Sequence, residues 1–95
     1  MQNYELTVVL PGKASANKKK KTKDFIEELV KTLEGKVKKS DEWGVIDLAY
    51  RIKKSEKGLF LYFKLEMEPT NAKQLDDKLR IEEDIIRYLL IKSDK

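Results

Sequence analysis

The sequence contains no cysteine and no histidine among its 95 residues. Without cysteine, the chain has no disulfide framework and no thiolate nucleophile, which is compatible with a reducing cytoplasm. Without histidine, it also lacks the most common general base, and with both residues missing nearly all zinc sites are excluded. Most enzyme classes are therefore excluded, and we expect neither a metal nor another cofactor.

Long apolar runs are absent as well. No run approaches the roughly 20 residues that a membrane-spanning helix needs. The first ten residues lead directly into a strand pattern, with no basic segment followed by an apolar signal core. We therefore expect no membrane association, and a chain that works in the compartment where it is made.

The residues that remain available for catalysis are poorly arranged for it. The acidic side chains include four adjacent pairs: Glu27-Glu28, Asp41-Glu42, Asp76-Asp77 and Glu82-Glu83. Adjacent residues point to different sides of a helix or strand, so these pairs are better explained as solvated surface. The four glycines are isolated and form no phosphate-binding loop. These patterns predict that the chain is not an enzyme and has no small-molecule substrate.

The charge balance is basic but moderate. Lysine and arginine number 21 against 17 aspartates and glutamates, giving a net charge of +4. This balance allows a modest interaction with nucleic acid or an acidic protein, and it is equally compatible with a solvated surface of mixed sign. The length supports one small hydrophobic core, so residues 1–95 are expected to form a single domain.

The beginning of the chain predicts a strand followed by a helix. Apolar residues alternate over residues 4–10, and a Pro-Gly pair then breaks the strand. Apolar residues at helical spacing follow over residues 15–34. We expect Ser15 to cap this helix and Gly35 to adopt the left-handed conformation just past its end.

Residues 36–52 predict a long second strand. A polar interruption is expected at residues 40–42 and a bulge at Gly44. Every second residue from Ile46 to Ile52 is apolar or aromatic, so this face is expected to lie on the core. Leu48 is then predicted to be a core leucine.

The second half predicts a strand, a helix and a final strand. Residues 53–58 are expected to form a turn and residues 59–67 a third strand. Residues 69–80 follow as a helix, capped by its first three residues, and its buried stripe includes Leu75. Branched residues over 85–92 predict the last strand.

The resulting order is β-α-β-β-α-β. This order is that of the ferredoxin-like α+β sandwich, in which a four-stranded antiparallel sheet carries both helices on one face. Strands one and three of the chain are then expected at the centre of the sheet. No internal repeat beyond this pseudo-symmetry and no second domain is expected.

The third strand predicts an aromatic surface on the face away from the helices. Its inward row is apolar throughout, while Phe60 and Tyr62 point outward. In RNA recognition motifs outward rings on this strand stack bases, but here the rings are one residue out of step. Packing beneath a loop is one explanation of the rings, and a protein-partner surface is the favoured one. The expected partner surface consists of Phe60, Tyr62, Val9, Leu89 and Ile91.

Three segments resemble the bacterial small-subunit ribosomal protein six family. Residues 44–53, Gly-Val-Ile-Asp-Leu-Ala-Tyr-Arg-Ile-Lys, are similar to its central motif. Residues 1–11 resemble its start, including a Tyr-Glu pair, and residues 79–92 resemble the end of its second helix and its last strand. The segments agree in order and spacing with the fold reached from periodicity, so the chain is identified as a member of this family.

The resemblance implies a structural ribosomal protein of the cytoplasmic small ribosomal subunit. Such a protein binds small-subunit ribosomal RNA in the platform and forms a heterodimer with ribosomal protein eighteen. Arg87 also stands out without the resemblance, because a charge among branched residues is well explained by a phosphate or carboxylate partner. By position in the family motifs, the RNA-contact candidates are Tyr50, Arg87, Lys92, Arg80, Lys53 and Lys54.

Two other functions remain open at this stage. One is a stand-alone ferredoxin-like regulatory or protein-interaction domain. The other is an acylphosphatase-like enzyme, which needs an activating Arg-Asn pair around a phosphate loop, whereas this chain offers only Pro11-Gly12-Lys13 after the first strand.

Overall fold

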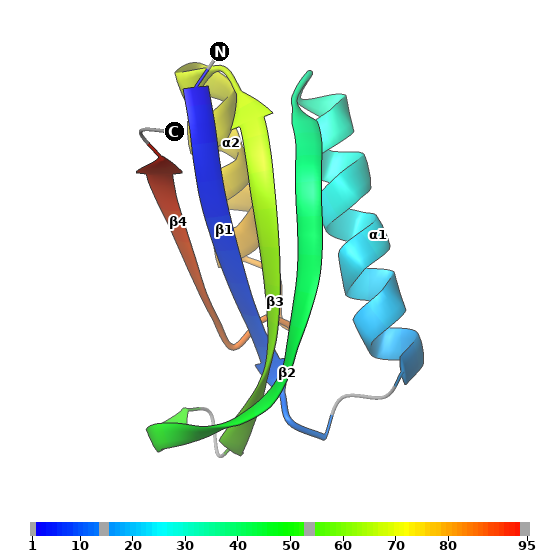
Figure 1. Ribbon diagram of the computed structural model, residues 1–95, viewed down its shortest axis with the longest axis vertical. Helices are drawn as coiled ribbons and strands as arrows, with labels where there is room; N and C mark the ends of the chain where they lie inside the picture. The colour runs from blue at the N-terminus through cyan, green and yellow to red at the C-terminus, as the bar shows by residue number, and fades with distance from the viewer. Residues whose placement is uncertain (1, 14–15, 53–54, 94–95) are drawn as a thin grey trace.

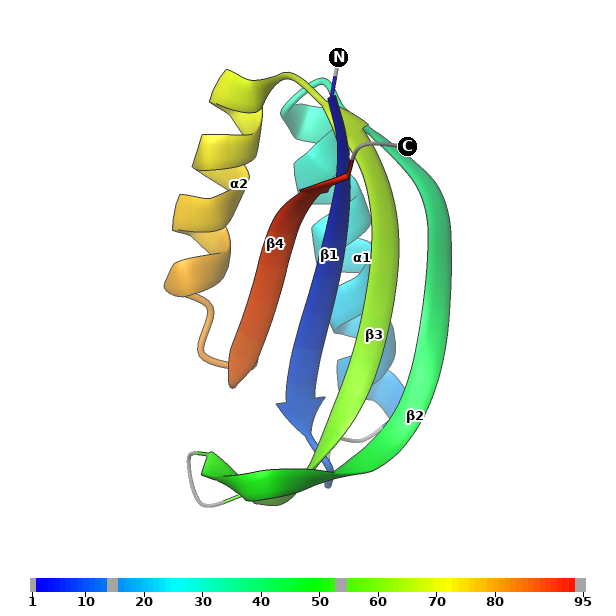
Figure 2. The same ribbon diagram turned by 60° about the vertical axis from the view of Figure 1, so that its left-hand side comes forward.

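The computed structural model describes residues 2–13, 16–52 and 55–93, without the side chains of residues 49–52 and 55. These described residues form, in chain order, β1 (Gln2–Pro11), α1 (Ala16–Thr32), β2 (Lys36–Ile52), β3 (Ser55–Met67), α2 (Pro69–Arg80) and β4 (Arg87–Ser93). The strands pair antiparallel in the order β2-β3-β1-β4. Both helices lie on one face of the sheet (Figures 1 and 2). The predicted ferredoxin-like order, with β1 and β3 at the centre, is confirmed.

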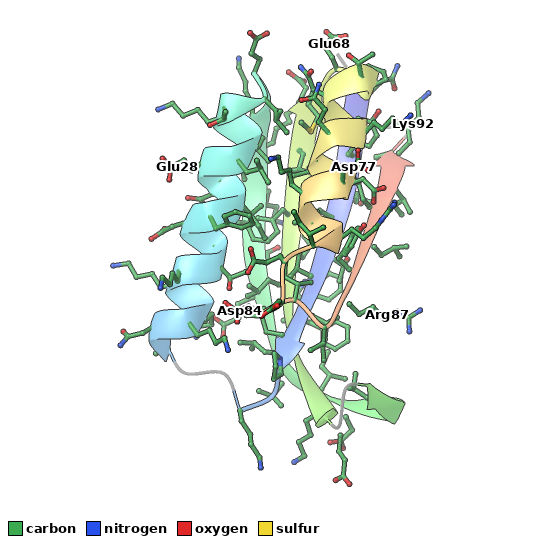
Figure 3. All side chains as sticks on the ribbon, turned by 180° about the vertical axis from the view of Figure 1, so that it is seen from behind. Glu28, Glu68, Asp77, Asp84, Arg87 and Lys92 are labelled. Carbon is green, nitrogen blue, oxygen red and sulfur yellow. The ribbon has the colours of Figure 1, made fainter. Side chains whose placement is uncertain are left out.

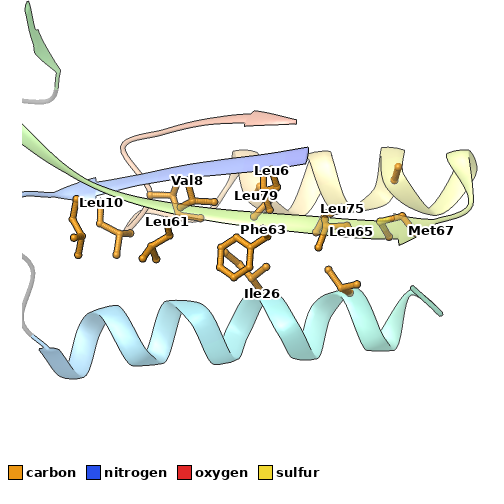
Figure 4. Packing of buried hydrophobic residues seen from close by; sticks show 14 residues of the cluster. Leu6, Val8, Leu10, Ile26, Leu61, Phe63, Leu65, Met67, Leu75 and Leu79 are labelled. Carbon is orange, nitrogen blue, oxygen red and sulfur yellow. The ribbon is translucent and has the colours of Figure 1, made fainter. Parts of the chain in front are cut away.

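The core lies between the sheet and the two helices. The inward row of β3 is buried from Leu59 to Met67, as its alternation predicted, and Phe63 packs toward Ile26 of α1 (Figure 4). The apolar stripe of α2 covers the other half of this face with Ala72, Leu75 and Leu79, all buried. Among the described residues, no helix is both long and apolar enough to cross a membrane.

The end of α1 differs from the prediction at Gly35. The residue with left-handed backbone is Glu34, with φ of 62°. The Gly35 amide donates to Val30 O at 2.8 Å and the Glu34 amide to Lys31 O at 3.0 Å, which is the Schellman pattern with Glu34 at the left-handed position. Gly35 is instead required by space, because a β-carbon there would lie 2.9 Å from Met67 Cβ. Ser15, the predicted cap at the other end, lies outside the described residues.

The start of α2 also differs from its predicted cap. Pro69 begins the helix and Glu68 precedes it without a side-chain capping hydrogen bond. Asn71 lies inside the first turn, and its Nδ2 donates to Leu33 O at 2.8 Å. This amide therefore joins the start of α2 to the end of α1 instead of capping its own helix, because the sequence-distant carbonyl was the partner within reach.

The β2–β3 hairpin is longer and differently oriented than predicted. Strand β3 already begins at Ser55, inside the expected turn, and residues 40–42 continue the β2 ladder without interruption. The bulge at Gly44 is confirmed, with φ of 86° and a register shift between Glu42 and Gly44. The extra residue changes the alternation, so Ile46 pairs with Gly58 on the face away from the helices.

The prediction that the face from Ile46 to Ile52 lies on the core is therefore wrong for Ile46 and Leu48, while the side chains of Tyr50 and Ile52 lie outside the described part. Ile46 is 42% exposed, and Leu48 is half-buried outside the core cluster. The distal part of the hairpin extends past both helices and bends across the end of β1 (Figures 1 and 2).

We predict that Leu75→Ala lowers the free energy of unfolding by about 2–5 kcal/mol, because it leaves a cavity where a fully buried side chain was. Leu48→Ala deletes the same atoms at a half-buried site, so we expect less than half of that loss. Chemical denaturation of both variants measures the difference. Equal losses would contradict the placement of Leu48 outside the core.

Candidate functional site

The face of the sheet away from the helices carries the residues predicted as a partner surface. Leu89 and Ile91 of β4 are 58% and 45% exposed there, and Phe60 and Tyr62 of β3 are half-buried. Between them, β1 presents Glu5 and Thr7, and Thr7 pairs with both Tyr62 and Leu89. The surface is therefore divided by a polar strand into an aromatic part and an aliphatic part.

Val9 does not contribute to this surface as predicted. It lies on the same face but is only 4% exposed. A β-carbon at Gly58 would lie 2.5 Å from Val9 Cγ1 and 3.2 Å from both Leu48 Cδ2 and Phe60 Cε1, so these side chains converge over Gly58. Val9 is covered because the bend of the hairpin brings Leu48 over the end of β1.

The aromatic part contains a ring pair that sequence reasoning missed. Trp43 of β2 stacks on Tyr62 with ring centroids 5.1 Å apart and an interplanar angle of 11°. Trp43 stands two residues after Asp41, which pairs with Tyr62, so alternation before the bulge at Gly44 places it on the outward face beside Tyr62. The Tyr62 hydroxyl donates to Glu5 Oε1 at 2.7 Å. This hydrogen bond holds the Tyr62 ring toward the neighbouring strand β1.

The surroundings of Tyr62 are acidic. The hydrogen bond to Glu5, then partial burial, then the charges of Glu5 and Asp41 raise the pKa of Tyr62 above its ordinary value. Asp41 is the residue opposite Tyr62 on β2. The Tyr62 ring therefore has two carboxylates, those of Glu5 and Asp41, near it, and their charges favour cations as neighbours.

Arg87 and Lys92 lie on β4, at the edge of the sheet. Both are exposed, and Figure 3 shows their side chains projecting away from the body of the molecule. Arg87 is in register with Val9 and Lys92 with Tyr4, so the two backbones are about 16 Å apart along the strand. Their separation suits contacts with two different phosphates better than one shared anion.

Arg80 is engaged within the protein. Its Nη2 lies 2.8 Å from Asp76 Oδ2, and the Tyr88 hydroxyl donates to Asp76 Oδ1 at 2.7 Å. A hydrogen bond with Tyr88 and the charge of Asp76 raise the pKa of Arg80. This cluster connects α2 to β4, so Arg80 has a structural explanation that the sequence did not suggest.

The other RNA-contact candidates cannot be grouped with these. Tyr50 lies in β2 with a side chain outside the described part, and Lys53 and Lys54 lie outside the described residues.

A shallow groove between α1 and the edge of β2 is lined by Lys31, Lys36, Lys38 and Lys39, with Glu27 as its acidic member. Within the described ranges, no three acidic, histidine or cysteine side chains form a metal-binding group.

Comparison with known proteins identifies a family. The sequence model described as Ribosomal protein S6 matches residues 3–92. The chain is 34% identical over 95 residues to a small ribosomal subunit protein bS6 from Gluconacetobacter diazotrophicus, of which it covers 59%. It is 30% identical over 95 residues to the protein of that name from Carboxydothermus hydrogenoformans, of which it covers 99%. The chain thus spans little more than half of the former relative's length.

The fold has a close counterpart among solved structures. A crystal structure of 30S ribosomal protein S6 from Thermotoga maritima superposes with a TM-score of 0.90, covering 97% of this chain and 87% of that one. The sequences are 19% identical, so this likeness speaks for the fold alone.

We predict that Tyr62 loses its proton at a higher pH than tyrosine in an unstructured peptide. Because its pKa is raised on folding, its contribution to stability is present below about pH 10 and is lost as the pH rises through the folded-state pKa. Glu5→Gln removes one of the charges and should lower the pKa of Tyr62. The NMR shift of Tyr62 Cζ against pH tests this, and an ordinary titration in the native chain would contradict it.

Proposed function

The chain belongs to the ribosomal protein S6 family, and from this premise we propose that it binds small-subunit ribosomal RNA in the platform together with ribosomal protein eighteen. The family match over residues 3–92 carries the proposal, because it includes both β4 and the outward face of the sheet. On this proposal the chain is a single-domain, non-enzymatic protein of the small ribosomal subunit in the cytoplasm.

The absence of catalytic chemistry supports a structural role. The sequence has no histidine or cysteine. The described ion pairs are surface pairs, such as Lys18 with Asp84 at 3.0 Å and Lys19 with Glu42 at 2.9 Å. Such pairs contribute little to stability or chemistry, so the functional surfaces are better sought among groups that project from the sheet.

The decisive test is whether the tagged chain copurifies with intact small ribosomal subunits from its own cells. We expect it in the subunit fraction at one copy per subunit, resistant to moderate salt. Recovery only as a free protein, with no ribosomal RNA, would instead favour the stand-alone ferredoxin-like interaction domain.

The RNA-binding part of the proposal rests on β4. Arg87 and Lys92 are exposed, positively charged and aligned on one edge of the sheet. A protein that neutralises phosphates releases counterions, so its affinity falls with salt concentration in proportion to the number of contacts.

We predict that Arg87→Ala and Lys92→Ala each weaken binding to ribosomal RNA and reduce the salt dependence by about one phosphate contact, with little effect on folding. Lys73→Ala removes the same charge from the exposed side of α2 and should leave the slope unchanged. Titrations at several salt concentrations measure the slopes. If all three variants behave alike, the β4 residues are only a solvated surface.

The partner-binding part rests on the outward face. Exposed Leu89 and Ile91 lie on one side of β1 and the aromatic pair on the other, and together these groups offer apolar anchors with a polar strand between them. Interfaces between proteins commonly combine aromatic anchors with polar contacts of this kind.

We predict that Tyr62→Ala weakens the heterodimer with ribosomal protein eighteen by about 1–2 kcal/mol, because the ring supports the interface. Tyr62→Phe keeps the ring that stacks on Trp43 and loses only the hydroxyl that bonds to Glu5, so we expect a smaller loss of affinity than for Tyr62→Ala. Calorimetry on the purified pair measures both. Native affinity in a folded Tyr62→Ala variant would exclude the ring from the interface.

A further inference from the structure

The Trp43–Tyr62 stack combines an open aromatic surface with a carboxylate. Although Trp43 stacks on Tyr62, it remains 51% exposed. Asp41 lies two residues before it on β2, directly opposite Tyr62, and its side chain is 43% exposed. An open indole beside an accessible carboxylate is a combination that suits a planar cation.

We propose that Trp43 and Asp41 receive an arginine side chain of the partner protein, the guanidinium lying on the indole and donating to the carboxylate. The proposal rests on the proposed function in that the partner is a second protein at the outward face. It goes further by assigning the contact chemistry and the residues. Arginine fits better than lysine, because its guanidinium is planar, stacks on rings and donates in a fork that matches a carboxylate.

The local charges oppose the alternative of a stacked RNA base. An exposed tryptophan on a sheet is a natural platform for bases, but such platforms lie in positively charged grooves that follow the phosphate backbone. Here Glu5 accepts a hydrogen bond from Tyr62 at 2.7 Å, and its charge and that of Asp41 lie close enough to raise the pKa of Tyr62. Phosphates beside these carboxylates would be repelled.

The lysines near the stack do not reverse this balance. Lys39 lies 3.5 Å from Asp41, and both side chains are largely exposed, at 62% and 43%. An exposed pair of this kind contributes little and exchanges readily, so an incoming arginine replaces Lys39 at small cost. Lys64 of β3 is opposite Lys39 of β2 and Glu5 of β1, so its charge has a like charge on one side and a carboxylate on the other.

Glu5 and Gly44 act as positioning residues for the indole. The hydrogen bond to Glu5 fixes Tyr62, and Tyr62 supports one face of Trp43. The positive φ of Gly44 forms the bulge that places Trp43 beside Tyr62, and a β-carbon at Gly44 would be strained by that φ although no atom lies within 4 Å of it. The site is thus preformed in the free chain.

Trp43 is the only tryptophan, so its fluorescence reports on the site directly. Three of the probes are short glycine-spaced peptides that contain arginine, lysine or citrulline, and citrulline is a neutral analogue of arginine. The fourth probe is a single-stranded oligouridylate. We expect the arginine peptide to change Trp43 fluorescence and to bind about 3- to 30-fold more tightly than the citrulline peptide, with lysine between them.

Asp41→Asn should reduce binding of the arginine peptide toward that of the citrulline peptide. The matched control is Glu42→Gln, which removes one negative charge from the neighbouring residue. Glu42 pairs with Lys19 of α1 at 2.9 Å on the helix side, so this variant should bind as the native chain does. Comparison of thermal unfolding shows that both variants are folded.

Three results would overturn the proposal. The first is equal binding of the arginine and citrulline peptides, and the second is an equal effect of Asp41→Asn and Glu42→Gln. The third is a fluorescence change with oligouridylate that grows stronger in Asp41→Asn, which would identify a base-stacking platform instead. The peptide titration needs no ribosomal component, so its failure is distinguishable from a failure to copurify with ribosomal subunits.

Discussion

Burial of one face of β3 is the constraint on which the rest of the structure depends. The strand pairs with β1 on one side and β2 on the other, and its inward row is buried beneath the helices. Because side chains alternate along a strand, this burial forces Phe60 and Tyr62 onto the opposite face. A shift of one residue would turn the apolar row toward water. The register that forms the core therefore also presents the candidate interface.

Regular periodicity made most of the fold predictable. The inward row of β3, the buried stripe of α2 and the element order all follow from spacings of two and 3.6 residues. The errors concerned residues whose conformation depends on distant contacts. Gly35 is needed because Met67 approaches it, and Asn71 bonds to Leu33 O, and neither neighbour is visible in the local sequence.

The candidate site was predictable only where its strands are regular. Arg87 and Leu89 could be placed on the outward face because β4 alternates regularly from Arg87 to Ile91. Trp43 was missed because its neighbour on β3 depends on the register between the two strands, which the local sequence does not show. The register shift between Glu42 and Gly44 changes the face of the residues that follow it on β2. The bulge itself was predicted at Gly44, but its effect on alternation was not carried through, so Leu48 was placed in the core.

The position of β2 at the edge of the sheet has a consequence before any assembly takes place. A strand of 17 residues with an open edge is a template for pairing with another copy of the chain, which is how many proteins begin to aggregate. Lys36, Lys38 and Lys39 concentrate positive charge along its first five residues, and the bulge at Gly44 interrupts the regular ladder beyond them. Both features discourage edge-to-edge association between identical chains. The lysines and the bulge of this strand thus disfavour pairing of its edge with the same edge of a second copy.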